Sequence, residues 1–288
     1  ASNDDLIFDG RVKTPMKWRL GGLSGTLLNL LDVHAAYGGS EAQIGLSELD
    51  EDGGYPQYRD RYFGIGATSV RVGGGNRGNG IRLIKLDTGN SGLEYTVFAA
   101  GSPLETNRQA VTLKGINQAS GVRLNVLGGS VGFAVLGGES GRIPTLNVGG
   151  GSVELGFGVD MSSSGTGTIN LTNASVRVNG AVNTLNHKAG TGTIQGSGGI
   201  VNLNVNGGTL FHLGIGPIAA IDITTPGGLN LGNAGPALTI SGAVTMAANT
   251  RLIDRGFRGT YQSGITLDGC RLSDVTIDLG PARTLRPS

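Results

Sequence analysis

The chain has 288 residues, of which 54 are glycine and only 15% are charged, and its formal net charge is +1. Its hydrophobic content of 38% is too high, and its net charge too small, for a disordered chain. Glycine follows no every-third-residue period, which excludes a collagen helix. The single cysteine, Cys270, excludes an internal disulfide framework and a cysteine-based zinc site, and we expect a buried, inert thiol.

The N-terminal region differs in composition from the rest, and we interpret residues 1–65 as an arm or cap with a docking segment. Residues 1–62 carry ten acidic and six basic residues, whereas residues 63–288 carry eleven and sixteen. An acidic arm can therefore contact the basic body of another subunit. The stretch LLNLLDV in this region fits a short helix or a buried strand. The polar opening ASNDDLIFDG is not a signal peptide as it stands, and we expect folding in a cytoplasm.

The stretch YPQYRDRYF, residues 55–63, holds four of the thirteen Phe and Tyr residues of the chain, together with two arginines. Tyr and Arg are the usual anchors of protein interfaces. Two interpretations stay open, because the stretch can pack as a cap on the first coil or contact another subunit or partner. The contact residues that we expect here are Tyr55, Tyr58, Arg59, Arg61, Tyr62 and Phe63.

Residues 66–280 consist of short runs that alternate apolar and polar residues, separated by Gly, Asn and Ser. Such a period of two predicts half-buried strands, and the Gly-Gly and Asn-Gly pairs predict tight turns. One strand–turn–strand pattern recurs along this region. It is LNVLGGSVGF from Leu124, LNVGGGSVEL from Leu146, INLTNASVRV from Ile169 and LNVNGGTLFH from Leu203.

The spacing of the strands decides between an antiparallel sandwich or barrel and a parallel β-helix. One set of apolar anchors steps by 18, 18 and 17 residues, and a second set steps by 18, 16 and 19. Two interleaved series with one common step indicate stacked coils of constant circumference, which hairpins have no reason to maintain. We therefore predict an all-β parallel β-helix or related solenoid. The two sets are Leu185, Leu203, Ile221, Leu238 and Val176, Ile194, Leu210, Leu229.

The last eight residues, 281–288, contain two prolines and two arginines and no apolar alternation. We expect an extended C-terminal tail. Its Arg283 and Arg286 are further candidates for a contact with a partner.

The acidic residues show no arrangement that suits hydrolysis of polysaccharides, a common activity of β-helices. A glycosidase needs two facing carboxylates, yet residues 161–221 contain no Asp or Glu. The best acidic cluster is Asp268, Asp274 and Asp278, and its alternation with apolar residues places it on solvated surface. We therefore expect no enzyme, no catalytic residues and no cofactor.

The three histidines, His34, His187 and His212, are far apart in the sequence and lack the spacing of zinc ligands. We expect no metal site. The alternation in TLFHLG suggests that His212 faces solvent.

Two family resemblances follow from these stretches. The coils of residues 120–250 resemble the Gly/Asn/Thr-rich solenoids of bacterial autotransporter passengers. The segments DDLIFDG, YPQYRDRYFGIGATSVRVGGG and IRLIKLDTG resemble those of uncharacterised β-strand-rich proteins encoded near bacteriophage capsid genes. The second resemblance implies a virion structural protein that decorates or cements a capsid as a homotrimer.

The phage resemblance implies that the partners are other copies of the chain and the major capsid protein, with neither nucleic acid nor membrane, and that the protein is located in the virion. Two alternatives stay open. A tailspike or fibre would bind or cleave host polysaccharide and needs a carboxylate pair. A secreted β-helix adhesin needs a signal peptide and a membrane anchor.

Overall fold

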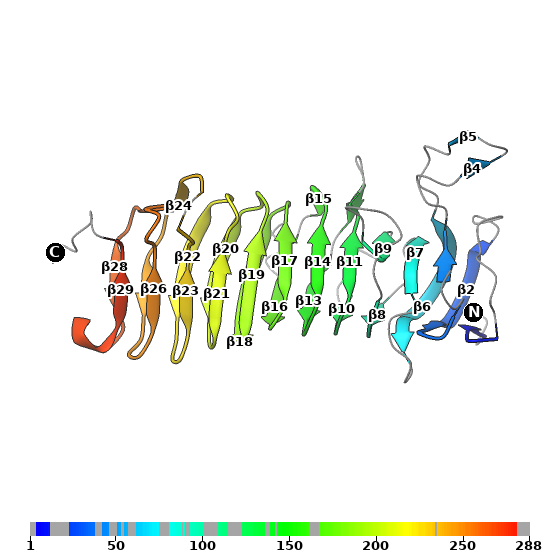
Figure 1. The fold of residues 1–288 in the computed structure, drawn as a ribbon, viewed down its shortest axis with the longest axis horizontal. Coiled ribbons are helices and arrows are strands. Elements are labelled where there is room, and N and C mark those ends of the chain that lie inside the picture. The colour runs from blue at the N-terminus through cyan, green and yellow to red at the C-terminus, as the bar shows by residue number, and fades with distance from the viewer. Residues whose placement is uncertain are drawn as a thin grey trace. The chain divides into compact units, whose positions relative to one another are not determined.

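The fold is known from a computed structural model that describes most of the chain. The described residues are 4–11, 23–37, 42–45, 51–52, 55–56, 62–74, 81–87, 89, 93–100, 109–114, 123–135, 139–141, 143–159, 161, 167–233 and 235–280, with the backbone alone for 23–27, 42–43, 51–52, 55–56, 81–82 and 140. They fall into two compact units, Ala1–Val159 and Asp160–Ser288. In both units parallel strands stack into the coils of a β-solenoid (Figure 1), as the sequence predicts.

The first unit contains two stacks of parallel strands. In one stack β1 pairs with β2, β2 with β6, β6 with β8, β8 with β10 and β10 with β13. In the other stack β3 pairs with β7, β7 with β9, β9 with β11 and β11 with β14. The bounds are β1 Asp5–Phe8, β2 Leu23–His34, β3 Ala42–Ile44, β6 Phe63–Gly74, β7 Ile81–Asp87, β8 Glu94–Val97, β9 Val111–Lys114, β10 Arg123–Val126, β11 Ser130–Phe133, β13 Thr145–Val148 and β14 Ser152–Leu155.

Two short pairs complete this unit. Strands β12, Ser140–Gly141, and β15, Gly158–Val159, are parallel, whereas β4, Glu51–Asp52, and β5, Tyr55–Pro56, form the one antiparallel pair among the described strands.

The second unit repeats this plan with shorter, more regular coils. One stack runs β16–β18–β20–β22–β25–β28, a second runs β17–β19–β21–β23–β26–β29, and β24 adds a third side between β22 and β27. The bounds are β16 Thr168–Thr172, β17 Ser175–Val178, β18 Val182–Ala189, β19 Thr191–Gln195, β20 Ile200–Val205, β21 Thr209–His212, β22 Ile218–Ile223, β23 Gly228–Asn230, β24 Leu238–Ile240, β25 Val244–Met246, β26 Arg251–Ile253, β27 Gly259–Tyr261, β28 Ile265–Leu267 and β29 Thr276–Asp278.

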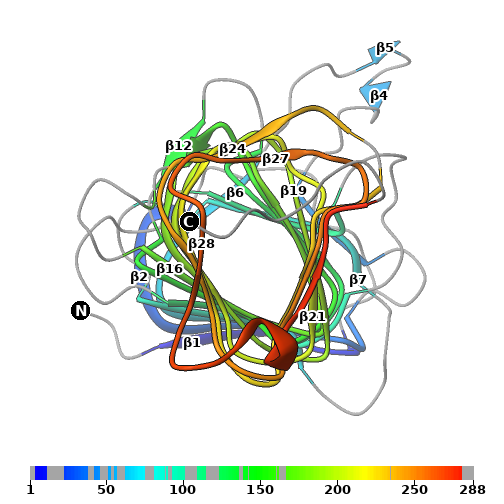
Figure 2. The same ribbon diagram turned by 90° about the vertical axis from the view of Figure 1, so that its left-hand side faces the viewer.

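The core lies inside the coils. In most of the described strands alternate residues point inward and are buried, so successive coils stack apolar side chains into columns. Leu185 is opposite Leu203, and Leu203 is opposite Ile221. In the end-on view of Figure 2, β16 and β21 lie on opposite sides of the coil, and such buried side chains fill the space between them.

Glycine at the coil corners permits the close stacking. Gly208 has φ +67°, and a Cβ atom there would lie 2.1 Å from the carbonyl oxygen of Gly190 in the preceding coil. Gly151 has φ +76° and would place a Cβ 2.2 Å from the carbonyl oxygen of Gly129. A residue with a side chain would both strain its backbone and collide with the preceding coil, which explains the repeated Gly-Gly turns.

The predicted register is right in part. The steps Leu185 to Leu203 to Ile221, Val176 to Ile194 and Leu210 to Leu229 are all observed pairs. Two steps are wrong, because Ile221 pairs with Val244 and Ile194 pairs with His212. In the first case the coil gains the extra strand β24, which carries Leu238. In the second case His212 occupies an inward position, although the apolar pattern predicted an aliphatic residue there.

The solenoid begins earlier than residue 66. The stretch LLNLLDV lies in strand β2, which pairs in parallel with β6, and β6 itself crosses the expected boundary at residue 65. The first coils therefore lie within residues 1–65. The apolar run hid the alternation, because Leu28 and Leu31 are buried while Leu30 between them is half-buried. The tail 281–288 lies outside the described residues.

Candidate functional site

Two of the expected contact residues are buried within the chain. Phe63 is 1% exposed, and its ring packs edge-on against Phe8, with 6.4 Å between centroids. Tyr62 is 8% exposed. Both side chains are therefore packed within the first unit, at the start of the coil strand β6, Phe63–Gly74.

The other expected contact residues are not placed by the structure. Only the backbone of Tyr55 is described, in β5. The remaining ones lie outside the described residues: Tyr58, Arg59, Arg61, Arg283 and Arg286.

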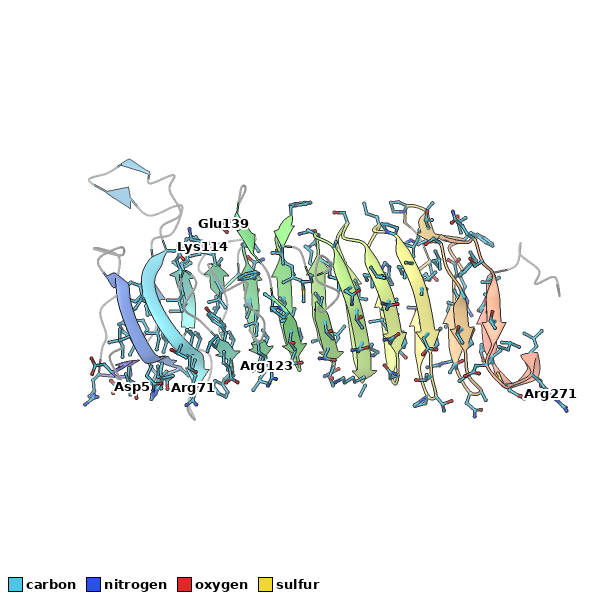
Figure 3. All side chains as sticks on the ribbon, turned by 180° about the vertical axis from the view of Figure 1, so that it is seen from behind. Asp5, Arg71, Lys114, Arg123, Glu139 and Arg271 are labelled. Atoms are coloured by element: carbon cyan, nitrogen blue, oxygen red, sulfur yellow. The ribbon has the colours of Figure 1, made fainter. Side chains whose placement is uncertain are left out.

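Tyr62 is fixed by a polar cluster on the first unit (Figure 3, which labels Lys114 and Glu139). Its hydroxyl donates to Oε2 of Glu139 across 3.3 Å, and Nζ of Lys114 lies 4.3 Å from the centre of its ring. The same ammonium lies 3.5 Å from Oδ2 of Asp87 and 3.7 Å from Oε1 of Glu139. A cation held between two carboxylates and over an aromatic face suits an anchoring role. The cluster therefore holds the segment that enters β6 against strands β7 and β9.

The acidic cluster of the second unit lies on the surface, as predicted. Asp268 and Asp274 are exposed, and Asp274 accepts the backbone N–H of Arg271 at the start of the 3-10 helix Leu272–Asp274. Asp278 pairs with Arg255, and this hydrogen bond lowers the pKa of the Asp278 carboxyl. Each carboxylate thus has a local structural role or faces solvent.

The prediction that His212 faces solvent is wrong. His212 is 1% exposed and points inward from β21, while His187 is fully buried in β18. Burial and the charge of Arg258 lower the pKa of His212 to about 4, and burial lowers that of His187. The described residues hold no group of three or more His, Cys, Asp or Glu that could bind a metal ion.

A buried hydrogen-bond network at Arg258 has no counterpart among the predictions from the sequence. Arg258 is 2% exposed, and its guanidinium donates to four backbone carbonyls, those of His212, Gly214, Leu231 and Pro236. Asp254, also buried, accepts the backbone N–H groups of Arg258 and Gly259 and the hydroxyl of Tyr261. The only sequence signal is the break in apolar alternation at IDRGFRG, which reads as a surface turn.

Cys270 is half-buried rather than buried, and its Sγ lies 3.6 Å from the carbonyl oxygen of Met246. The described part of the chain has no helix long and apolar enough to cross a membrane.

Comparisons with known protein families, curated proteins and solved structures found no significant match. The function proposed below is therefore argued from the fold and the surface chemistry of the chain.

Proposed function

We propose that the protein is a structural component of a bacteriophage virion, which decorates or cements the capsid as a homotrimer. The sequence resemblance suggested this role. The observation that supports it best is the regular stacking of coils around continuous buried columns, such as Leu185, Leu203 and Ile221.

This architecture is well suited to a mechanical role. Each coil buries apolar side chains against both neighbouring coils, and the parallel strands saturate one another's backbone groups along the stack. The tight glycine corners leave little slack between coils, as at Gly208 over Gly190. The surface of such a scaffold is available for contacts along its length.

The proposed contacts lie in the stretch of sequence between β5 and β6 and in the segment that follows the last coil. Tyr58, Arg59 and Arg61 follow the β4–β5 pair and precede Tyr62, which the Lys114 cluster anchors. Arg283 and Arg286 follow the last coil. We propose that these residues bind other copies of the chain and the major capsid protein. The proposal assigns the chain no catalytic role.

The deciding experiment is quantitative mass spectrometry of particles purified from the source of this chain. Decoration predicts a copy number comparable with that of the major capsid protein. A few copies per particle would instead indicate a spike or fibre, and absence from particles would favour the adhesin alternative. Native mass spectrometry of the purified chain tests the trimer separately.

A further inference from the structure

One outward face of the second unit combines an aromatic ring, amide groups and arginines. It is formed by strands β17, β19, β21, β23 and β26. Phe211 projects from the middle of β21, between the inward Leu210 and His212, and is half-exposed. Thr193 lies opposite Phe211 in the preceding coil and Asn230 in the following one. We call this surface the Phe211 face, formed by Arg177, Thr193, Gln195, Phe211, Asn230 and Arg251.

The amides on this face keep unused hydrogen-bond donors. Oε1 of Gln195 accepts from Nη2 of Arg177 across 3.0 Å, and Oδ1 of Asn230 accepts the backbone N–H of Gly232 across 2.8 Å. Among the described residues, nothing accepts a hydrogen bond from Nε2 of Gln195 or from Nδ2 of Asn230. Both groups are half-buried, so they are oriented by the sheet and remain accessible.

The charge on this face is positive. Arg177 and Arg251 flank Phe211, whereas residues 161–221 contain no acidic residue. Arg251 donates to the hydroxyl of Thr209 and lies across Gly228, which offers no side chain to obstruct it. In the next coil Asp278 lies opposite Ile253, and it already pairs with Arg255 at 2.6 Å.

We propose that the Phe211 face binds a saccharide chain that carries carboxylate groups. An aromatic ring can stack on the C–H face of a sugar, amide N–H groups can donate to its hydroxyl oxygens, and arginine pairs with carboxylates in a planar fork. Four coil steps separate Arg177 from Arg251, which amounts to about 19 Å at the usual strand spacing. This length accommodates several sugar rings in a row. The inference does not depend on the proposed virion role.

Two other occupants fit the face less well. Two arginines on a flat surface supply few phosphate contacts for a nucleic acid, whose binding rests on many of them. Two copies joined through this same face would bring arginines against arginines, because none of its six residues is acidic. Both occupants are outcomes of the test.

The test uses the full chain and a hexamer of α-1,4-linked galacturonic acid, with neutral maltohexaose for comparison, in isothermal titration calorimetry. We expect the acidic hexamer to bind and the neutral one to bind at least about tenfold more weakly. Phe211→Ala should weaken binding about fivefold or more. Arg251→Gln should weaken it about threefold and reduce its sensitivity to salt.

Two control variants match these changes. Phe157→Ala removes a 79% exposed ring from the first unit, and Lys188→Gln removes an exposed cation from β18. Neither residue belongs to the Phe211 face, so both should bind the hexamer within about twofold of the original chain. Unchanged melting temperatures would show that all four variants are folded.

Several results would overturn the proposal. These are absence of binding by the acidic hexamer, equal affinity for maltohexaose, and full binding by Phe211→Ala. Equal binding of a single-stranded oligonucleotide of the same charge would mark a general polyanion surface. Dimerisation that Phe211→Ala abolishes would mark the face as a contact between copies.

Discussion

Nη1 of Arg258 donates to the carbonyl oxygen of Leu231 across 2.6 Å and so links two successive coils of the second unit from the inside. The same guanidinium reaches His212 and Gly214 in the coil before. One side chain therefore holds three coils together at a place where the apolar column is interrupted.

Replacing Arg258 by Met should destabilise the chain by about 3–5 kcal/mol, since it leaves four backbone carbonyls inside the coils without their donor. Urea unfolding followed by circular dichroism measures this. Arg255→Met is the matched control, because Arg255 is largely exposed and pairs only with Asp278. That change should cost less than about 1 kcal/mol. Equal losses would show that the buried network is not important for stability.

Acid should weaken the fold through its buried histidines. Their pKa values are lower in the folded chain than the usual value of about 6.5, so the unfolded chain binds more protons below that pH. The free energy of unfolding should be constant above pH 6.5 and fall as the pH decreases towards 4. His212 alone should account for a loss of about 3 kcal/mol.

Urea midpoints measured between pH 4 and 8 test this dependence. His212→Gln should flatten the pH profile, because glutamine carries no group that titrates in this range. The explanation would be rejected by a His212→Gln profile as steep as that of the original chain. The lowered pKa values of Asp9 and Asp278 act only at more acidic pH.

The inward orientation of Val176 predicts opposite results at two adjacent positions of β17. Val176 is fully buried, while Arg177 beside it is exposed. Val176→Asp should cost about 4 kcal/mol or more, because the carboxylate has no partner inside the coil. Arg177→Asp should cost less than about 1 kcal/mol. An unchanged melting temperature for Val176→Asp would contradict the register.

Substitution of two glycines by alanine distinguishes the effect of backbone strain from the effect of a steric collision between coils. Gly208 and Gly264 both have positive φ, +67° and +75°, but only at Gly208 would a Cβ meet another coil. Gly264→Ala should cost about 1 kcal/mol through strain alone. Gly208→Ala should lower the free energy of unfolding by clearly more, about 3 kcal/mol, because the preceding coil must move to make room for the methyl group. Thermal unfolding of the pair provides the comparison, and similar losses would contradict close stacking.

The proposed contact segment can be tested by the double variant Tyr58→Ala with Arg61→Ala. It should reduce incorporation into particles about tenfold without changing the circular dichroism spectrum, because it alters no residue of the described strands. Quantitative mass spectrometry of particles gives the occupancy. Tyr62→Phe is the control, since it retains the ring beneath Lys114. Full occupancy by the double variant would exclude this segment as the contact.

The sequence by itself determined the strands, their glycine turns and the parallel stacking, because these follow from local alternation and a nearly constant step. The column of Leu185, Leu203 and Ile221 was predictable for that reason. The surface location of Asp268 and Asp274 followed from the same alternation.

Only the tertiary structure decided which residues meet when a coil changes length or a polar group turns inward. Because of the extra strand β24, Ile221 pairs with Val244. A search for apolar positions also cannot predict that His212 and Arg258 are buried, because both are polar. The carbonyls that satisfy Arg258 come from positions 22 to 46 residues away. The Phe211 face likewise exists only after stacking, because the coils bring Arg177, Gln195, Phe211 and Arg251 onto one surface, and no local sequence signal encodes that proximity.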